Sequence, residues 1–203
     1  MLARAIASGV RRLCVPGYDL PSSQAAIALA EAHPEMVDAA VGVHPHFAAA
    51  ATSADWEELE RLAAHSRVVA VGEIGLDFHR NLSPADQQIS AFERQLDLAG
   101  AIGKPVLVHD REAHEIVSRM LVGWNGPPGR PHRGVLHCFS GDASMALRLA
   151  AAGFLISFAL PVSFSLAIGP RAAAAALPEG SYLVETDSPW LAPGGGERRN
   201  EPT

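Results

Sequence analysis

The sequence predicts an α/β fold, namely an incomplete (β/α)8 TIM barrel with about seven strands. Short apolar runs alternate with helical patterns along the whole chain. The apolar runs are continuous rather than alternating, which is typical of parallel strands covered on both faces. Adjacent strand-helix units are about 30 residues apart, the size expected for a barrel of this class. A doubly wound open sheet is the alternative, but no G-x-G-x-x-G motif follows the first strand.

Seven segments are predicted to be strands, and a helix is predicted in most of the gaps between them. The strands are residues 12–17, 38–46, 68–73, 105–110, 134–139, 154–160 and 182–187. The helices are residues 20–33, 52–65, 83–103, 112–124, 142–153 and 165–177. Hydroxyl side chains are expected to cap three of these helices, because they accept hydrogen bonds from free N–H groups. Ser22 or Ser23 is expected near the cap of the first helix, Thr52 or Ser53 at the N-cap position of the second, and Ser83 as the cap of the third.

Composition limits the class of protein. The 203 residues fit one large domain, and 48% hydrophobic residues are enough for a core. A net charge of −6 argues against a broad basic surface for nucleic acid, although bound cations would reverse the charge inside a site. Cys14 and Cys138 form no C-x-x-C motif, so a reducing, cytoplasmic setting is expected.

One uncharged stretch, residues 149–170, is long enough to span a membrane. Gly153 and Pro161 interrupt it, and three serines dilute its apolar character. We expect it to divide into a helix end, a strand and the start of another helix. The N-terminal residues contain no long apolar segment typical of a secretory signal. The sequence therefore predicts no contact with a membrane.

Ionisable side chains stand where the predicted strands end. They are His44, Glu73, His109, His137 and Asp187. The C-terminal ends of barrel strands meet on one face, so these side chains are expected to converge. A single histidine there would more often be structural, but several buried charges need a cation or a partner. Imidazole nitrogens and carboxylate oxygens together suit Zn²⁺, Mn²⁺ or Fe²⁺, and more carboxylate and water suit Mg²⁺.

The motifs around these residues resemble a known family. "VGVHPH", "GEIGLDFHR", "PVLVHDREAHE", "GVLHCFSGD" and "ETDSPWLAP" occur in order along the chain. Together they are similar to the TatD-type metal-dependent deoxyribonucleases, a family of the metal-dependent hydrolase superfamily. The similarity covers essentially the whole chain. It implies exonucleolytic hydrolysis of DNA phosphodiester bonds, starting from single-stranded ends.

The resemblance also implies roles for the residues at the strand ends. Glu73 would bridge two divalent ions (Mg²⁺, Mn²⁺ or Zn²⁺), and His109 and His137 would complete one of the two sites. Asp187 would bind the other ion and orient or deprotonate the attacking water. His44 would meet the scissile phosphate. Asp187, Glu73 and His44 are therefore the expected catalytic residues.

Three further residues are secondary candidates. His46 and Arg111 are expected to contact substrate, since Arg111 is predicted to open a helix where a phosphate would bind. A salt bridge from Arg111 to Asp110 or Glu112 is the alternative. Asp77 is expected to support the loop after Glu73 or to orient a ligating histidine.

The sequence departs from the family pattern at both ends. Family members begin with a strand ending in Asp-x-His-x-His, and a helix follows the segment matching "RNEP" at residues 199–202; neither is present. We therefore expect a single domain, residues 1–203, truncated at both ends, monomeric, and binding about one ion. The alternatives are D-aminoacyl-tRNA deacylation or another amidohydrolase-like activity, and an inactive truncated relic.

Overall fold

One sheet of seven parallel strands organises the molecule, whose computed structural model describes residues 1–194 and 199–202. The strands follow each other in sequence order, β1-β2-β3-β4-β5-β6-β7. Their bounds are β1 Leu13–Pro16, β2 Val37–Val41, β3 Val68–Asp77, β4 Val106–Arg111, β5 Gly134–Leu136, β6 Phe154–Phe158 and β7 Tyr182–Val184. The sheet curls into part of a barrel, which confirms the predicted incomplete TIM barrel.

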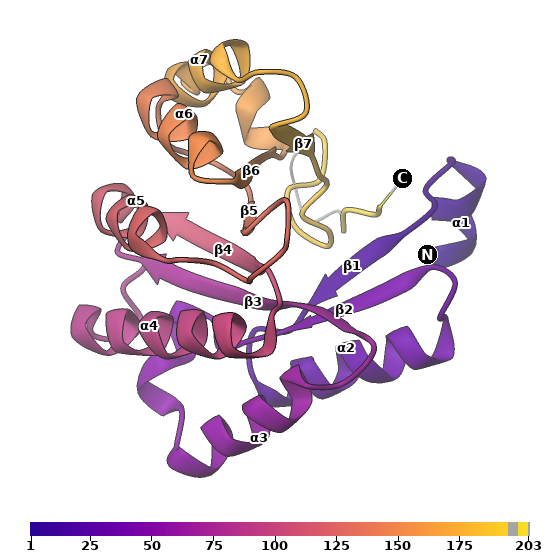
Figure 1. Cartoon of the computed structure of the whole chain (residues 1–203). Helices are drawn as coiled ribbons and strands as arrows, with labels where there is room; N and C mark the ends of the chain where they lie inside the picture. The colour runs from indigo at the N-terminus through magenta and orange to yellow at the C-terminus, as the bar shows by residue number, and fades with distance from the viewer. Residues whose placement is uncertain (195–198, 203) are drawn as a thin grey trace.

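Helices connect the strands and cover the sheet. They are α1 Leu2–Ala7, α2 Leu20–Ala32, α3 Ser53–Ala63, α4 Ala85–Ile102, α5 His114–Gly123, α6 Ala143–Ala151 and α7 Ile168–Ala176, with short 3₁₀ helices at η1 Pro45–Ala50 and η2 Leu160–Ser163. In Figure 1, α2, α3 and α4 lie below β1 to β4, and α6 and α7 lie at the top of the molecule beside β6. Because every connection is a strand, a crossover and a parallel strand, all strand C-termini point toward one rim.

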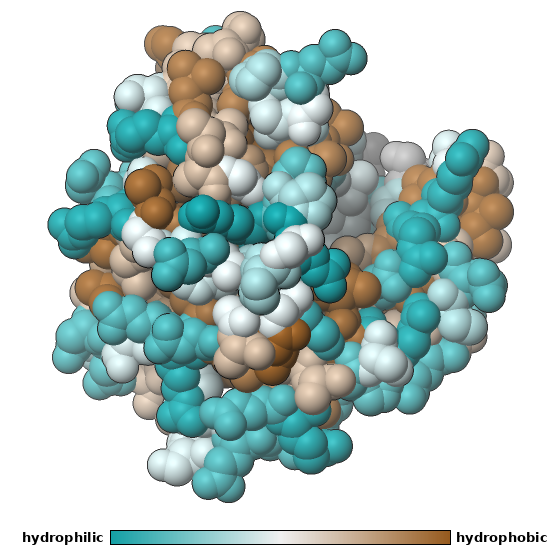
Figure 2. All heavy atoms as spheres, in the orientation of Figure 1, coloured by the Kyte–Doolittle hydropathy of each residue, from teal (hydrophilic) through white to brown (hydrophobic). Residues whose placement is uncertain are grey.

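The core lies between the sheet and its helices. Val71, Ile74 and Val108 on the central strands are fully buried, and Phe92 of α4 is fully buried against β3. Removing such side chains from water stabilises the fold by roughly 1.5–3 kcal/mol each. Hydrophilic side chains cover the surface over α3, whereas the surface at α7 is mostly hydrophobic (Figure 2). The central strands therefore form a rigid support for the residues at their C-terminal ends.

One predicted helix cap, Ser83, is wrong, whereas Ser22 lies near the cap of α2 as expected. Asp19, not a serine, caps α2: its carboxylate accepts from the Ser22 N–H at 2.8 Å, and Ser22 Oγ accepts from the Asp19 N–H at 3.0 Å. Ser83 lies before the cap position because its hydroxyl bonds to η1, where it donates to the His46 carbonyl at 3.0 Å. Thr52 caps α3 as expected.

The uncharged stretch of residues 149–170 divides as expected into the end of α6, strand β6, η2 and the first residues of α7. Helix α7 begins at Ile168, three residues later than predicted, so Gly169 and Pro170 lie in its first turn. Proline is tolerated there because the first-turn N–H groups have no partner within the helix. Across the described residues, no helix has both the length and the apolar character needed to cross a membrane.

Candidate metal centre

Glu73 is the centre of a cluster of histidines. Its Oε1 atom lies 2.8 Å from His137 Nε2, 2.9 Å from His109 Nδ1 and 3.4 Å from His44 Nε2. The three histidines come from the ends of β5, β4 and β2, so four of the five strand-end residues converge. Their side chains are mostly buried, with 19% of the Glu73 side chain exposed. The cluster is therefore largely shielded from bulk water.

Strand β3 continues past Glu73 to Asp77, so Glu73 lies inside the strand and not at its end as predicted. The pairing of β3 with β4 shifts register between Val71 and Ile74, on either side of Glu73. Gly75, with φ +134°, pairs with His109, and a Cβ there would lie 2.0 Å from the His109 carbonyl oxygen. Only glycine permits this approach of the two backbones, which keeps the Glu73 and His109 strands in close register.

The histidines determine the charge of Glu73. Burial opposes ionisation, but the charge of His137 and hydrogen bonds from the histidines outweigh it and hold the pKa of Glu73 well below its ordinary value. Burial also disfavours the charged form of His137, yet Glu73 and Glu185 raise the pKa of His137 well above 6.5. The pKa of His109 is raised in the same way by Asp77 and Glu73 against the effect of burial. Without metal, protons on these imidazoles balance the buried carboxylate.

His44 differs from the other two histidines because burial, its largest influence, lowers its pKa. Its Nδ1 atom accepts a hydrogen bond from the His46 N–H at 3.2 Å, which leaves Nε2 facing Glu73. A neutral imidazole is the form that binds metal. His44 is therefore suited to be a ligand as well as the substrate contact predicted from the sequence.

Asp77 orients two of the histidines by contacting their Nε2 atoms. Its Oδ2 atom lies 2.8 Å from His46 Nε2 and 3.3 Å from His109 Nε2. Buried Gln88 of α4 accepts from the Asp77 N–H at 2.9 Å and donates to the Asp77 carbonyl at 3.2 Å. These contacts leave His109 Nδ1 free to face Glu73, and they direct His46 toward Asp77.

Glu185 is a member of the site that the sequence interpretation did not single out. Its Oε1 accepts from the Cys138 N–H and lies 3.6 Å from His137 Nδ1, on the opposite side of the ring from Glu73. Burial opposes its ionisation, but His137 and the Cys138 N–H lower its pKa. The signal was present in the motif "ETD", whose two carboxylates are two residues apart. Only the second was identified.

Asp187 follows β7 and adopts a left-handed backbone conformation, with φ +52°. The pKa of Asp187 is raised to about 6, chiefly by burial; His137 and His109 act against this rise, and the charges of Glu73 and Glu185 add to it. Asp187 lies just after β7, where the charges of the Glu73 cluster influence it. Its carboxylate is close to half-protonated at a pH near 6, which suits a group that exchanges protons.

Arg111 does not open a helix, contrary to expectation. It is the last residue of β4, exposed at the rim, and α5 begins three residues later at His114. Neither expected acidic neighbour pairs with Arg111 in the described residues: Asp110 contacts His114 at 2.8 Å and Glu112 contacts His79 at 2.6 Å. The Arg111 guanidinium is thus available at the same rim as Glu73.

The cluster fits a divalent cation. Ligand atoms of His44, Glu73 and His109 all lie within 4.8 Å of one another. Two imidazole nitrogens and one carboxylate oxygen form a donor set found with Zn²⁺, Mn²⁺ and Fe²⁺. His137 contacts the same Glu73 oxygen but lies outside this mutual set. The geometry therefore adds His44 to the expected ligands.

Comparison with known proteins identifies the family. The family described as TatD related DNase matches residues 1–203. The chain belongs to this family. The uncharacterised metal-dependent hydrolase YabD of Bacillus subtilis is 36% identical over 204 residues, covering 100% of this chain and 78% of its own length. A 3'-5' ssDNA/RNA exonuclease TatD of Edwardsiella piscicida is 39% identical over 215 residues, covering 100% of this chain and 79% of its own length.

A solved structure supports the same family assignment. The TatD homologue YjjV of Escherichia coli superposes with a TM-score of 0.89 at 32% identity, covering 99% of this chain and 77% of that one. The TatD-family fold predicted from the sequence motifs is therefore confirmed, and its strand C-termini carry the Glu73 cluster.

Proposed function

We propose that this TatD-family chain is a divalent-metal-dependent hydrolase that cleaves phosphodiester bonds of DNA. The observation that carries the proposal is the convergence of His44, His109 and His137 on one oxygen of Glu73 at the C-terminal rim of the sheet. Such rims are where barrel enzymes place their active sites. The names of the relatives, metal-dependent hydrolase and 3'-5' ssDNA/RNA exonuclease, support the reaction class.

The metal would be held by His44, Glu73 and His109. His137, which contacts the same oxygen of Glu73, would be a further ligand of the metal. When bound, a divalent ion acidifies a water molecule and polarises the phosphodiester. The chain's own contribution is to hold the ligands in place: Asp77 fixes His109 and His46, and Glu185 faces the far side of the His137 ring. Because these partners are carboxylates, they also make the imidazoles better ligands.

Asp187 is our candidate for the general base. With a pKa of about 6 it is mostly ionised at neutral pH, and it can still accept a proton from the attacking water. Asp187 and Glu73 could also hold a second ion between them. The described residues contain one mutual set of three ligands, so we propose about one tightly bound ion in this chain.

The substrate would reach the site across the rim. Arg111 at the end of β4 is our candidate for the contact to the phosphate. For His44 that contact is the alternative to metal binding, because only its Nε2 faces the cluster while its Nδ1 accepts from the His46 N–H. The rings of His44 and His46 lie together, with 4.3 Å between their centroids. The name of the Edwardsiella relative favours exonucleolytic cleavage from single-stranded ends. We further propose that the chain acts as one domain and as a monomer in the cytoplasm.

Cleavage of labelled single-stranded DNA tests this proposal. The purified protein with Mn²⁺ or Mg²⁺ should shorten the DNA, and a chelator should stop the reaction. Glu73→Gln should reduce the rate at least about 100-fold, because it removes the charge that holds the ligands together. The control Glu93→Gln changes an exposed carboxylate on α4 and should leave the rate unchanged.

Cleavage that survives the chelator, or that Glu73→Gln leaves intact, would contradict the proposed site. No cleavage of DNA at all would favour the inactive relic. Release of the amino acid from D-aminoacyl-tRNA without DNA cleavage would instead favour the deacylase alternative.

A further inference from the structure

Two aromatic side chains, Tyr18 and Phe47, stack on each other at the rim of the sheet. Their ring centroids lie 5.6 Å apart, with an angle of 26° between the ring planes. Tyr18 follows the end of β1 by two residues, and Phe47 lies in η1, which follows β2. Both residues therefore lie beyond the C-terminal ends of neighbouring parallel strands, at the same end of the sheet as the Glu73 cluster.

Backbone hydrogen bonds join this aromatic pair to the metal centre. The His44 N–H donates to the Tyr18 carbonyl at 2.9 Å, and the Phe47 N–H donates to the His44 carbonyl at 2.8 Å. The carbonyl of Gly17, directly before Tyr18, accepts from the Glu73 N–H at 2.8 Å. The two aromatic residues are therefore direct backbone partners of one member of the cluster, and one of them is also next to the backbone partner of Glu73.

Both rings are partly exposed, although the core does not use them. Tyr18 is 49% exposed and Phe47 is 39% exposed, and neither belongs to the hydrophobic core. The carboxylate next to Tyr18, that of Asp19, is engaged at the start of α2, where it accepts from the Ser22 N–H at 2.8 Å. The pair therefore offers an uncharged aromatic surface beside the metal centre.

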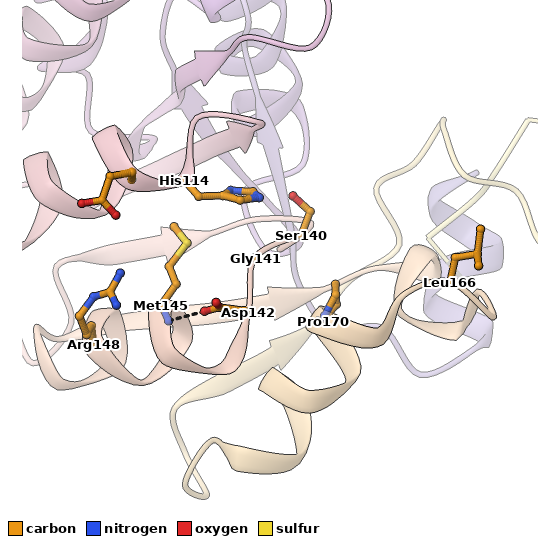
Figure 3. Close-up of a pocket in the computed structure, with 10 residues that line it drawn as sticks. His114, Ser140, Gly141, Asp142, Met145, Arg148, Leu166 and Pro170 are labelled. Carbon is orange, nitrogen blue, oxygen red and sulfur yellow. Dashed lines mark hydrogen bonds between the residues drawn. The ribbon is translucent and has the colours of Figure 1, made fainter.

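The pocket between α5, α6 and the start of α7 is less suited to a polyanion. Its lining combines the Arg148 guanidinium with the carboxylates of Glu115 and Asp142 (Figure 3). These carboxylates would repel the phosphates of a DNA strand. Stacking on an aromatic ring needs no charge, so the Tyr18–Phe47 pair is free of this conflict.

We propose that the Tyr18–Phe47 pair is a stacking platform for a base of the DNA strand next to the bond being cleaved. Nucleobases of every kind stack on aromatic side chains, which suits a strand of varying sequence. The inference rests on the proposed nuclease function, because the backbone contacts to His44 and Glu73 place the pair beside the reacting bond. It also gives a chain of net charge −6 a means of holding a polyanion through its bases.

Fluorescence anisotropy with a 5'-labelled hexathymidylate, in the presence of a chelator, measures binding without cleavage. Tyr18→Ala and Phe47→Ala should each raise Kd about 5- to 100-fold, the effect of losing one stack between a base and an aromatic ring. The slope of log Kd against log salt should stay the same, because no phosphate contact is lost. Tyr18→Phe should bind like the unsubstituted chain, because it keeps the ring.

A hexamer with the same sugar-phosphate backbone but without bases shows whether the lost contact is to a base. Tyr18→Ala and Phe47→Ala should leave the Kd of this abasic hexamer unchanged. Tyr182→Ala is the matched control, because Tyr182 is 45% exposed but begins β7, at the opposite end of the sheet. It should leave the Kd of both hexamers unchanged.

Three results would overturn the inference: equal losses for the two hexamers, equal effects of Tyr18→Ala and Tyr182→Ala, or no binding of hexathymidylate to the unsubstituted chain. The two proposals fail separately. Metal-dependent cleavage with an unchanged Kd in Tyr18→Ala and Phe47→Ala overturns only the platform. A base-dependent loss of binding in these variants, without cleavage by the unsubstituted chain, overturns only the nuclease function.

Discussion

The residues at the rim have different roles, which follow from their contacts. Glu73 contacts three imidazoles through one oxygen, whereas Asp77 and Glu185 each contact the ring of a histidine from the side away from Glu73. A carboxylate behind a histidine fixes the orientation and tautomer of the ring and raises its basicity. Removing such a carboxylate should therefore weaken metal binding without destroying the site.

Glu185→Gln tests whether Glu185 orients the His137 ring for metal binding. Competition for Mn²⁺ with a fluorescent chelator should show an affinity about 10- to 100-fold lower than that of the unsubstituted chain. Glu179→Gln, an exposed residue just before β7, should have no effect. If Glu185→Gln binds Mn²⁺ as tightly as the control, the orienting role of Glu185 is wrong.

At the scale of elements, the sequence predicts which segments are strands better than where each strand ends. Continuous apolar runs identify all seven strands. The residues of β2, β3 and β6 are mostly buried, whereas the edge strand β7 is exposed at all three positions. β3 continues past Glu73 because its last residues pair with β4, a tertiary contact that leaves no local pattern. Glu185 was missed for a related reason. Its importance depends on the His137 ring, which comes from a different strand.

The close approach of β3 and β4 makes Gly75 sensitive to substitution. Gly75→Ala should lower the free energy of unfolding by roughly 3 kcal/mol or more, since its Cβ would overlap the His109 carbonyl and φ is +134°. Gly9→Ala is the control with positive φ (+89°) but open space, and it should cost only about 1 kcal/mol. Urea unfolding compares the two, and equal losses would show that the β3–β4 contact is not tight.

Over the whole molecule, the buried cluster predicts how stability depends on pH without metal. The pKa values of His109 and His137 are raised, so their stabilisation is complete below about pH 6.5 and is lost as pH rises through their folded-state values. The pKa of Asp187 is raised to about 6 by burial, so its ionisation costs stability earlier, as pH rises from about 3.8 to 6. The lowered pKa of Glu73 gives stabilisation above about pH 4.5 that is lost on acidification.

The metal-free protein should therefore be most stable between about pH 4.5 and 6.5. Bound Mn²⁺ should reverse the trend above that range, because the ion binds neutral imidazoles and displaces their protons. Thermal unfolding from pH 5 to 8.5, with chelator and with Mn²⁺, measures both trends. A metal-free melting temperature that rises steadily from pH 6.5 to 8.5 would contradict the charge assignment of the cluster.

The central claim, that Glu73 organises a metal site, is tested most directly by calorimetric titration with Mn²⁺. We expect about one tightly bound ion per molecule in the unsubstituted chain and in the control Glu93→Ala, and none in Glu73→Ala. Two tight ions in the unsubstituted chain would contradict the assignment of ligands, as would tight binding retained after Glu73→Ala.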